Sequence, residues 1–154
     1  MIPKPRVYIH APWPHNLSTR RAEIRTKVLN AITAAGFELQ EFNVSGLPVR
    51  LQWTFDEAAR LTDRCQGAFI LALPKYDFGP DLLLPSEFSH YECALALSKG
   101  TPTLIVTEEG APSDGIVNPP ASLRLLHGLR LCTPPWEHRR GLQAGFLGHV
   151  ATQC

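Results

Sequence analysis

The chain has 154 residues, of which 44% are hydrophobic and 19% are charged, and its net charge is +1. This length and composition predict a single globular domain over residues 1–154 with a sizeable core. The small net charge excludes a global electrostatic attraction to nucleic acid or to anionic membranes.

Neither a membrane segment nor a metal site is expected from the sequence. No apolar run approaches the roughly 18–20 residues that a membrane helix needs, and the first residues lack the apolar region of a signal peptide. The four cysteines have no paired spacing and are expected to be reduced thiols of a cytoplasmic protein. The six histidines are scattered, and no His-Glu-x-x-His or Cys-x-x-Cys motif occurs.

Strand and helix signals alternate from the start of the chain. Residues 6–10 form a β-prone run that the prolines at 12 and 14 end. Ser18 can cap a helix with apolar residues at helical spacing, and Gly36 ends that helix. Residues 37–44 alternate in polarity, as a strand does.

The alternation continues in the middle of the chain. A capping box at Thr54 begins a second helix that runs to about Arg64. Residues 67–73 are a continuous apolar run, which suits a parallel strand covered on both faces. A third helix is predicted at residues 87–98 and a further buried strand at residues 103–107.

The signal weakens after these elements. Residues 108–121 are rich in Pro and Gly and predict a loop, and residues 123–132 hold at most a short helix and a strand. Residues 136–150 predict a last helix, weakened by its glycines. Together the elements predict an α/β fold: a doubly wound, mainly parallel sheet of about four or five strands, flavodoxin-like in order.

A flavodoxin-like order places a ligand where the order of strands reverses, beyond the carboxyl ends of the first and third strands. The loops expected to meet there are residues 10–17 and 74–85, and the second leads into the helix that carries Glu92. The chain has no glycine-rich dinucleotide motif, P-loop or Gly-x-Ser-x-Gly elbow. These absences disfavour a dehydrogenase, a P-loop enzyme and an α/β-hydrolase, and a carboxylate is the expected reactive group.

Glu92 is the strongest candidate for that carboxylate. It lies in the early turns of its helix, where the helix dipole favours the ionised form. There it could bind ribose hydroxyls, stabilise the positive charge of a breaking glycosidic bond, or attack the anomeric carbon. Ser89 and Glu92 also have capping-box spacing, and this spacing alone leaves capping and catalysis equally open.

The motif around Glu92 resembles those of two enzyme families. The stretch SEFSHYECALA at residues 86–96 resembles the TIR-domain pattern Ser-x-Trp-Cys-x-x-Glu-Leu-x-x-Ala, with Phe, Ser and Cys in place of Trp, Cys and Leu. The stretch ECALALSKGTP at residues 92–102 is similar to Glu-Leu-Gly-x-Ala-x-x-x-Gly-Lys-Pro of nucleoside 2-deoxyribosyltransferases, whose upstream Asp-x-Gly-Thr is missing here. Both families cleave N-glycosidic bonds, and the catalytic Glu of each falls on Glu92.

The TIR resemblance implies an NAD glycohydrolase with a TIR-like fold, in which Glu92 steadies the oxocarbenium-like ribose. It further implies a bacterial antiviral effector or signalling domain that acts when copies assemble, with NAD as substrate and no cofactor. The transferase resemblance implies a nucleoside 2-deoxyribosyltransferase or deoxynucleotide N-hydrolase, with Glu92 as covalent nucleophile. A non-catalytic TIR-like adaptor is a third alternative.

Further residues at the end of the first strand, on the loops after the first two strands and at the starts of the first and third helices are candidates for substrate binding: His10, Trp13, Arg20, Trp53, Ser86 and Phe88. The two tryptophans could stack on a base or on nicotinamide, although packing is their commoner use. Arg20 could meet a pyrophosphate, although an exposed helix-surface charge is commoner. Ser86 could hold the substrate or cap its helix.

Overall fold

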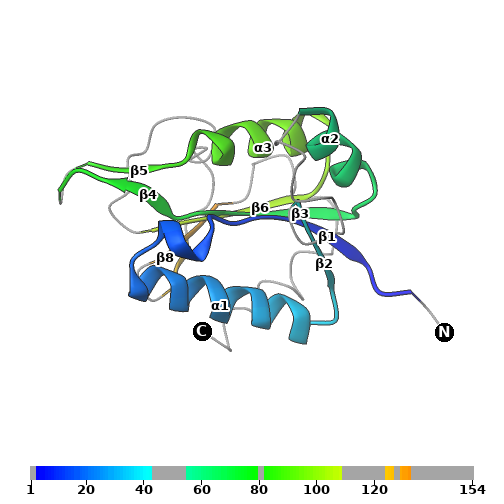
Figure 1. Ribbon diagram of the computed structural model, residues 1–154. Coiled ribbons are helices and arrows are strands. Elements are labelled where there is room, and N and C mark those ends of the chain that lie inside the picture. Colours follow the sequence, from blue (N-terminus) through cyan, green and yellow to red (C-terminus); the bar gives the residue numbers. More distant parts are fainter. Residues whose placement is uncertain (1–2, 43–54, 80–81, 109–123, 127–128, 133–154) are drawn as a thin grey trace.

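A central β-sheet organises the part of the chain that the computed structural model describes, residues 3–42, 55–79, 82–108, 124–126 and 129–132 (Figure 1). Its strand order is β2-β1-β3-β6-β8-β7. Four of these strands run parallel: β1 (Arg6–His10), β2 (Glu38–Glu41), β3 (Gly67–Ala72) and β6 (Thr103–Glu108). The other two pair antiparallel at one edge, β8 (Leu129–Cys132) on β6 and β7 (Arg124–Leu126) on β8.

Helices cover both faces of the parallel strands. Helix α1 (Thr19–Ala34) lies on one face, and α2 (Phe55–Asp63) and α3 (Glu87–Ser98) lie on the other (Figure 1). A short 3-10 helix, η1 (Pro14–Asn16), connects β1 to α1. The predicted doubly wound α/β fold with a mainly parallel, flavodoxin-like sheet is confirmed, although the sheet in the described residues has six strands where about four or five were predicted.

The ends of α1 follow from two residues. The Ser18 hydroxyl accepts a hydrogen bond from the Arg21 amide at 3.4 Å, so it is the predicted N-cap. Beyond the other end, Gly36 has a φ of 91°, in the left-handed region where a residue without a β-carbon is favoured. The predicted start and end of this helix are therefore confirmed.

Strand β1 separates two parts of the core. Val7 and Ile9 pack with Val28 and Ile32 of α1. Tyr8 belongs to the cluster on the opposite face, which includes Ala96 of α3. Because side chains alternate along a strand, His10 lies on the same face as Tyr8. The sequence of β1 therefore directs two polar side chains toward α3.

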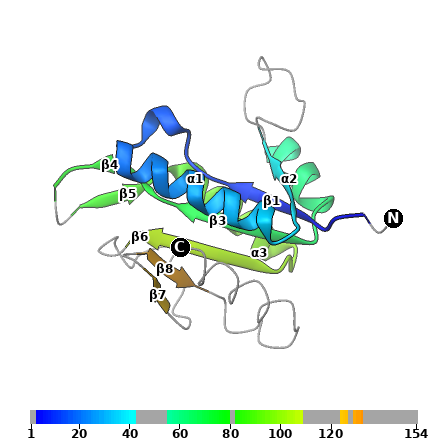
Figure 2. The same ribbon diagram turned by 90° about the horizontal axis from the view of Figure 1, so that it is seen from below.

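The predicted loop at residues 74–85 is wrong in part, because it contains a β-hairpin. Strand β4 (Pro74–Asp77) pairs antiparallel with β5 (Leu83–Pro85). The turn uses Gly79 at a φ of 117°, and the Gly79 amide donates to the Asp77 carboxylate at 3.2 Å. Figures 1 and 2 show the hairpin projecting beyond the carboxyl ends of the parallel strands.

Two further predictions need correction. The described part of residues 123–132 forms the two strands β7 and β8, not a helix and a strand, because β6 offers an edge on which β8 pairs. The strand predicted at residues 37–44 is β2, which spans only Glu38–Glu41. The predicted cap at Thr54, the loop after Glu108 and the last helix at residues 136–150 lie outside the described residues. No helix within residues 3–42, 55–79 and 82–108 combines the length and apolar character that crossing a membrane requires.

Candidate active site

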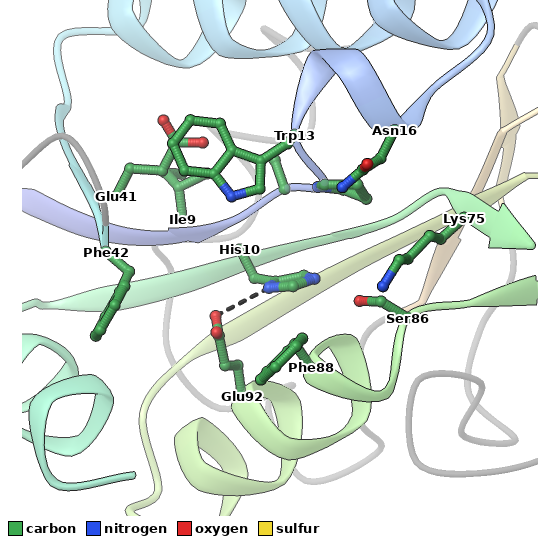
Figure 3. Close-up of a pocket in the computed structure, with 12 residues that line it drawn as sticks. Ile9, His10, Trp13, Asn16, Glu41, Phe42, Lys75, Ser86, Phe88 and Glu92 are labelled. Atoms are coloured by element: carbon green, nitrogen blue, oxygen red, sulfur yellow. Dashed lines mark hydrogen bonds and ion pairs between the residues drawn. The ribbon is translucent and has the colours of Figure 1, made fainter. Parts of the chain in front are cut away.

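The segments that follow β1 and β3 converge on one cavity, as the strand order predicts. Strands β1 and β3 are parallel neighbours, and the order of strands reverses between them. The cavity has a volume of about 170 Å³. It lies between the end of β1, the end of β2, β4 and the start of α3, and its lining includes Ile9, His10, Ala11, Pro12, Trp13, Asn16, Glu41, Phe42, Lys75, Ser86, Phe88 and Glu92 (Figure 3).

The size of this cavity limits what the described residues can enclose. Pockets for drug-sized ligands measure roughly 300–1,000 Å³. A cavity of about 170 Å³ therefore suits one ring of a larger ligand, such as a ribose or a nicotinamide, with the remainder of the ligand outside it.

Glu92 points into this cavity from α3 and is 4% exposed. Its Oε2 atom accepts a hydrogen bond of 2.5 Å from the Tyr8 hydroxyl. The same oxygen lies 2.9 Å from His10 Nδ1, and Figure 3 marks this contact with a dashed line. Both partners come from β1, 84 and 82 residues away in the chain. The carboxylate is therefore held by the strand at the switch point.

Burial keeps Tyr8 in its donor form. Tyr8 is fully buried, and its pKa is raised far above its ordinary value, first by burial and then by the charge and hydrogen bond of Glu92. A phenol that stays protonated donates to the carboxylate at any pH at which the protein is folded.

This shift gives a testable pH dependence. Because folding raises the pKa of Tyr8, its contribution to stability is complete below about pH 10, the ordinary pKa, and is lost as pH rises above that value. We expect the phenolate absorbance of Tyr8, obtained as the difference between the unsubstituted protein and Tyr8→Phe, to rise together with the loss of circular dichroism. A phenolate signal from Tyr8 in protein that is still folded would contradict the buried hydrogen bond.

The capping alternative for Ser89 and Glu92 is wrong. Helix α3 begins at Glu87, and its N-cap is Ser86, whose hydroxyl accepts from the Ser89 amide at 3.3 Å. Ser89 thus lies inside the first turn, and Glu92 turns toward β1 because Tyr8 and His10 hold it there. The interpretation of Ser86 as a helix cap is confirmed, and the same residue also lines the cavity.

Comparison with known proteins assigns no family. No family model matches the chain, and no curated protein matches it. The chemistry of the site therefore has to follow from its residues.

The structure gathers most of the predicted substrate-binding residues around Glu92. His10, Trp13, Ser86 and Phe88 line the cavity. Trp13 is 43% exposed, and its ring stacks on His15 with centroids 6.0 Å apart. Arg20 lies exposed on α1 and is not among the lining residues. Trp53 lies outside the described residues.

Several lining residues and contacts of the site were not predicted from the sequence: Tyr8, Asn16, Glu41, Phe42, Lys75 and the contact of Ser89 with His10. Tyr8 could have been found, because it lies two residues before the predicted His10 on the same strand, and residues two apart on a strand share a face. Lys75 could not, because it lies on β4, in a stretch predicted to be a loop.

Two charged side chains, Glu41 and Lys75, also line the cavity. Glu41 at the end of β2 pairs with Arg25 of α1, and Arg25 also donates to the Pro12 carbonyl at 2.9 Å. Arg25 thus connects the end of β2 with the loop after β1 and stabilises the wall of the cavity that these two segments form. On the other side, the ammonium of Lys75 lies 4.0 Å from Glu87 at the start of α3. Among the described residues, no group of three or more side chains of the types that bind metal ions is gathered.

Proposed function

We propose that the protein hydrolyses the N-glycosidic bond between nicotinamide and ribose in NAD. The observation that carries this proposal is the buried carboxylate of Glu92, which faces the cavity while Tyr8 and His10 fix its position. A fixed carboxylate in a site shielded from water interacts strongly with positive charge. The oxocarbenium-like ribose of a breaking glycosidic bond carries such a charge.

The leaving group determines what else the site needs. Nicotinamide departs from NAD as a neutral molecule, taking the bonding electron pair, so the cleavage step requires no general acid. The exposed ring of Trp13 and the ring of Phe88 offer apolar faces for nicotinamide or adenine at the cavity. Lys75 supplies a positive charge beside the cavity for a phosphate of the same ligand.

The resemblance to TIR domains supports the wider setting of this proposal. It supports a cytoplasmic antiviral effector or signalling domain of bacterial type. It also supports activation by self-association, in which neighbouring copies complete each other's site. A cavity that encloses only one ring of the ligand is consistent with such completion.

A substrate comparison tests the proposal. The purified chain is incubated over a wide range of protein concentrations with NAD and, separately, with 2′-deoxynucleosides and their 5′-monophosphates. Released nicotinamide and released base are measured by chromatography, and a Glu92→Gln preparation serves as the blank for contaminating enzymes. We expect nicotinamide release from NAD, with a rate per molecule that rises with protein concentration.

The other outcomes are equally informative. Base release from the deoxynucleosides alone would overturn the choice of NAD and favour the transferase or N-hydrolase alternative. If the folded protein turns over neither substrate class at any concentration, the result would favour a non-catalytic adaptor.

A further inference from the structure

A series of hydrogen bonds connects Glu92 with Ser86, another residue that lines the cavity. His10 Nδ1 lies 2.9 Å from Glu92 Oε2, and His10 Nε2 lies 2.8 Å from Ser89 Oγ. Ser89 Oγ in turn lies 3.1 Å from Ser86 Oγ. All four residues are buried, Ser89 completely, and Ser86 is 5% exposed and lines the cavity. Glu92 and Ser86, the first and last residues of this series of hydrogen bonds, therefore both face the cavity.

The partners of His10 set the direction of these bonds. An ionised carboxylate can only accept, so Nδ1 carries the proton that is shared with Glu92. In the neutral imidazole, Nε2 is then an acceptor, and the Ser89 hydroxyl donates to it. With its proton used in this way, Ser89 Oγ accepts from the Ser86 hydroxyl. Each hydroxyl is thus oriented to pass a proton from the cavity toward the imidazole.

Carboxylate, imidazole and hydroxyl follow one another in the order that activates a serine in hydrolases. Ser89, however, has no exposed surface and does not line the cavity, so it cannot attack a substrate itself. The group at its far side is the Ser86 hydroxyl, which can meet a water molecule in the cavity. The arrangement therefore suits the transfer of a proton and not the attack of a serine.

We propose that Ser86, Ser89 and His10 form a proton relay that deprotonates the water attacking the ribose. This inference rests on the proposed hydrolysis of NAD and adds the group that acts as its base. In this scheme Ser86 contacts the attacking water, and His10 receives the proton through Ser89. Glu92 then stabilises the imidazolium across the 2.9 Å contact.

The step balances in atoms and charge. Nicotinamide has already left with the electrons of the C–N bond, which leaves a positively charged ribose opposite Glu92. The water oxygen forms a bond to the anomeric carbon, and one O–H bond of the water breaks. Its proton goes to Ser86 Oγ, the Ser86 proton goes to Ser89 Oγ, and the Ser89 proton goes to His10 Nε2. The positive charge thus moves from the ribose to His10, and one carboxylate faces it throughout.

A competition between two acceptors tests the relay. Water must lose a proton when it attacks, whereas the ring nitrogen of a pyridine base such as 3-acetylpyridine has no proton to lose. Both acceptors need the same cleavage step at Glu92, but only water needs the relay. Hydrolysis and base exchange are therefore measured together, as ADP-ribose and as the acetylpyridine dinucleotide formed from NAD.

We expect Ser89→Ala to lower hydrolysis about 100-fold, the lower range for loss of general base catalysis. Base exchange should fall much less, so the ratio of the two products should change at least about tenfold. Ser86→Asn interrupts the relay at the cavity while it retains a side chain that can cap α3, and it should shift the ratio in the same direction. Ser98→Ala, on the exposed end of the same helix, is the control and should leave the ratio unchanged.

The outcomes separate this inference from the proposed function. If the unsubstituted protein forms neither product from NAD, the proposed function fails. If it forms both and the ratio is unchanged in Ser89→Ala and Ser86→Asn, the relay is overturned and the proposed function stands. Nitrogen NMR gives an independent readout, because the relay requires neutral His10 to carry its proton on Nδ1. A proton on Nε2 of the neutral ring would also overturn it.

Discussion

Replacing Glu92 with glutamine is expected to lower kcat for NAD hydrolysis by at least about 1,000-fold, which corresponds to about 4 kcal/mol of transition-state stabilisation. The amide has the shape of the carboxylate but no negative charge to place opposite the ribose cation. Stability should not fall correspondingly, because a buried charge that has left water is replaced by a neutral group. Steady-state rates and urea unfolding of both proteins measure the two effects.

Glu87 provides the matched control for this substitution. It lies on the same helix, but its side chain is 50% exposed and contacts Lys75 and Tyr76 at the surface. Glu87→Gln is expected to change kcat by less than about twofold, because surface charge pairs contribute little. A comparable loss in both variants, or retention of activity in Glu92→Gln, would remove Glu92 from the reaction.

Replacing Tyr8 with phenylalanine is expected to lower the free energy of unfolding by about 1.5–3 kcal/mol, the range for hydrogen bonds to charged groups. The substitution deletes only the hydroxyl whose 2.5 Å hydrogen bond reaches Glu92, and it leaves the buried carboxylate with one donor fewer. The carboxylate also loses one of the groups that fix its position, so kcat should fall as well. Urea unfolding at neutral pH gives the stability change from the shift in midpoint and the slope.

Tyr76 tests whether burial is the reason for this effect. Its hydroxyl also contacts a carboxylate, that of Glu87 at 3.3 Å, but at the surface. Tyr76→Phe is expected to change the free energy of unfolding by less than about 1 kcal/mol. When Glu92 is already glutamine, Tyr8→Phe should lower the free energy of unfolding by less, because the negative charge to which the hydroxyl donates is absent. Additive effects would show that Tyr8 stabilises the fold independently of Glu92.

The fold could be predicted where the signals in the sequence are local. The apolar run at residues 67–73 and the cap at Ser18 determine a buried strand and a helix start through their own chemistry. The β4–β5 hairpin escaped prediction because its turn lies in a stretch rich in Gly and Pro that is typical of loops. The strands β7 and β8 escaped because their pairing depends on the edge of β6, which is distant in the chain.

The candidate site was only partly predictable for the same reason. Glu92 could be located because its motif is continuous in sequence. Its partners Tyr8 and His10 are separated from it by more than half of the chain, and only the strand order brings them together. The spacing of Ser89 and Glu92 suggested capping, but the N-cap of α3 is Ser86, three residues before Ser89. Local spacing could not decide whether Glu92 caps the helix or faces the cavity, because its contacts with Tyr8 and His10 are tertiary.

Because side chains alternate along β1, the geometry of the candidate site depends on the register of this strand. Tyr8 and His10 face α3, whereas Val7 and Ile9 face α1. A shift of β1 by one residue would exchange these faces and present two aliphatic side chains to Glu92. A single-residue insertion or deletion early in the chain would therefore leave a similar composition and helix content but remove the contacts of Tyr8 and His10 with the buried carboxylate. The candidate site around Glu92 can therefore form only when the first strand pairs in its correct register.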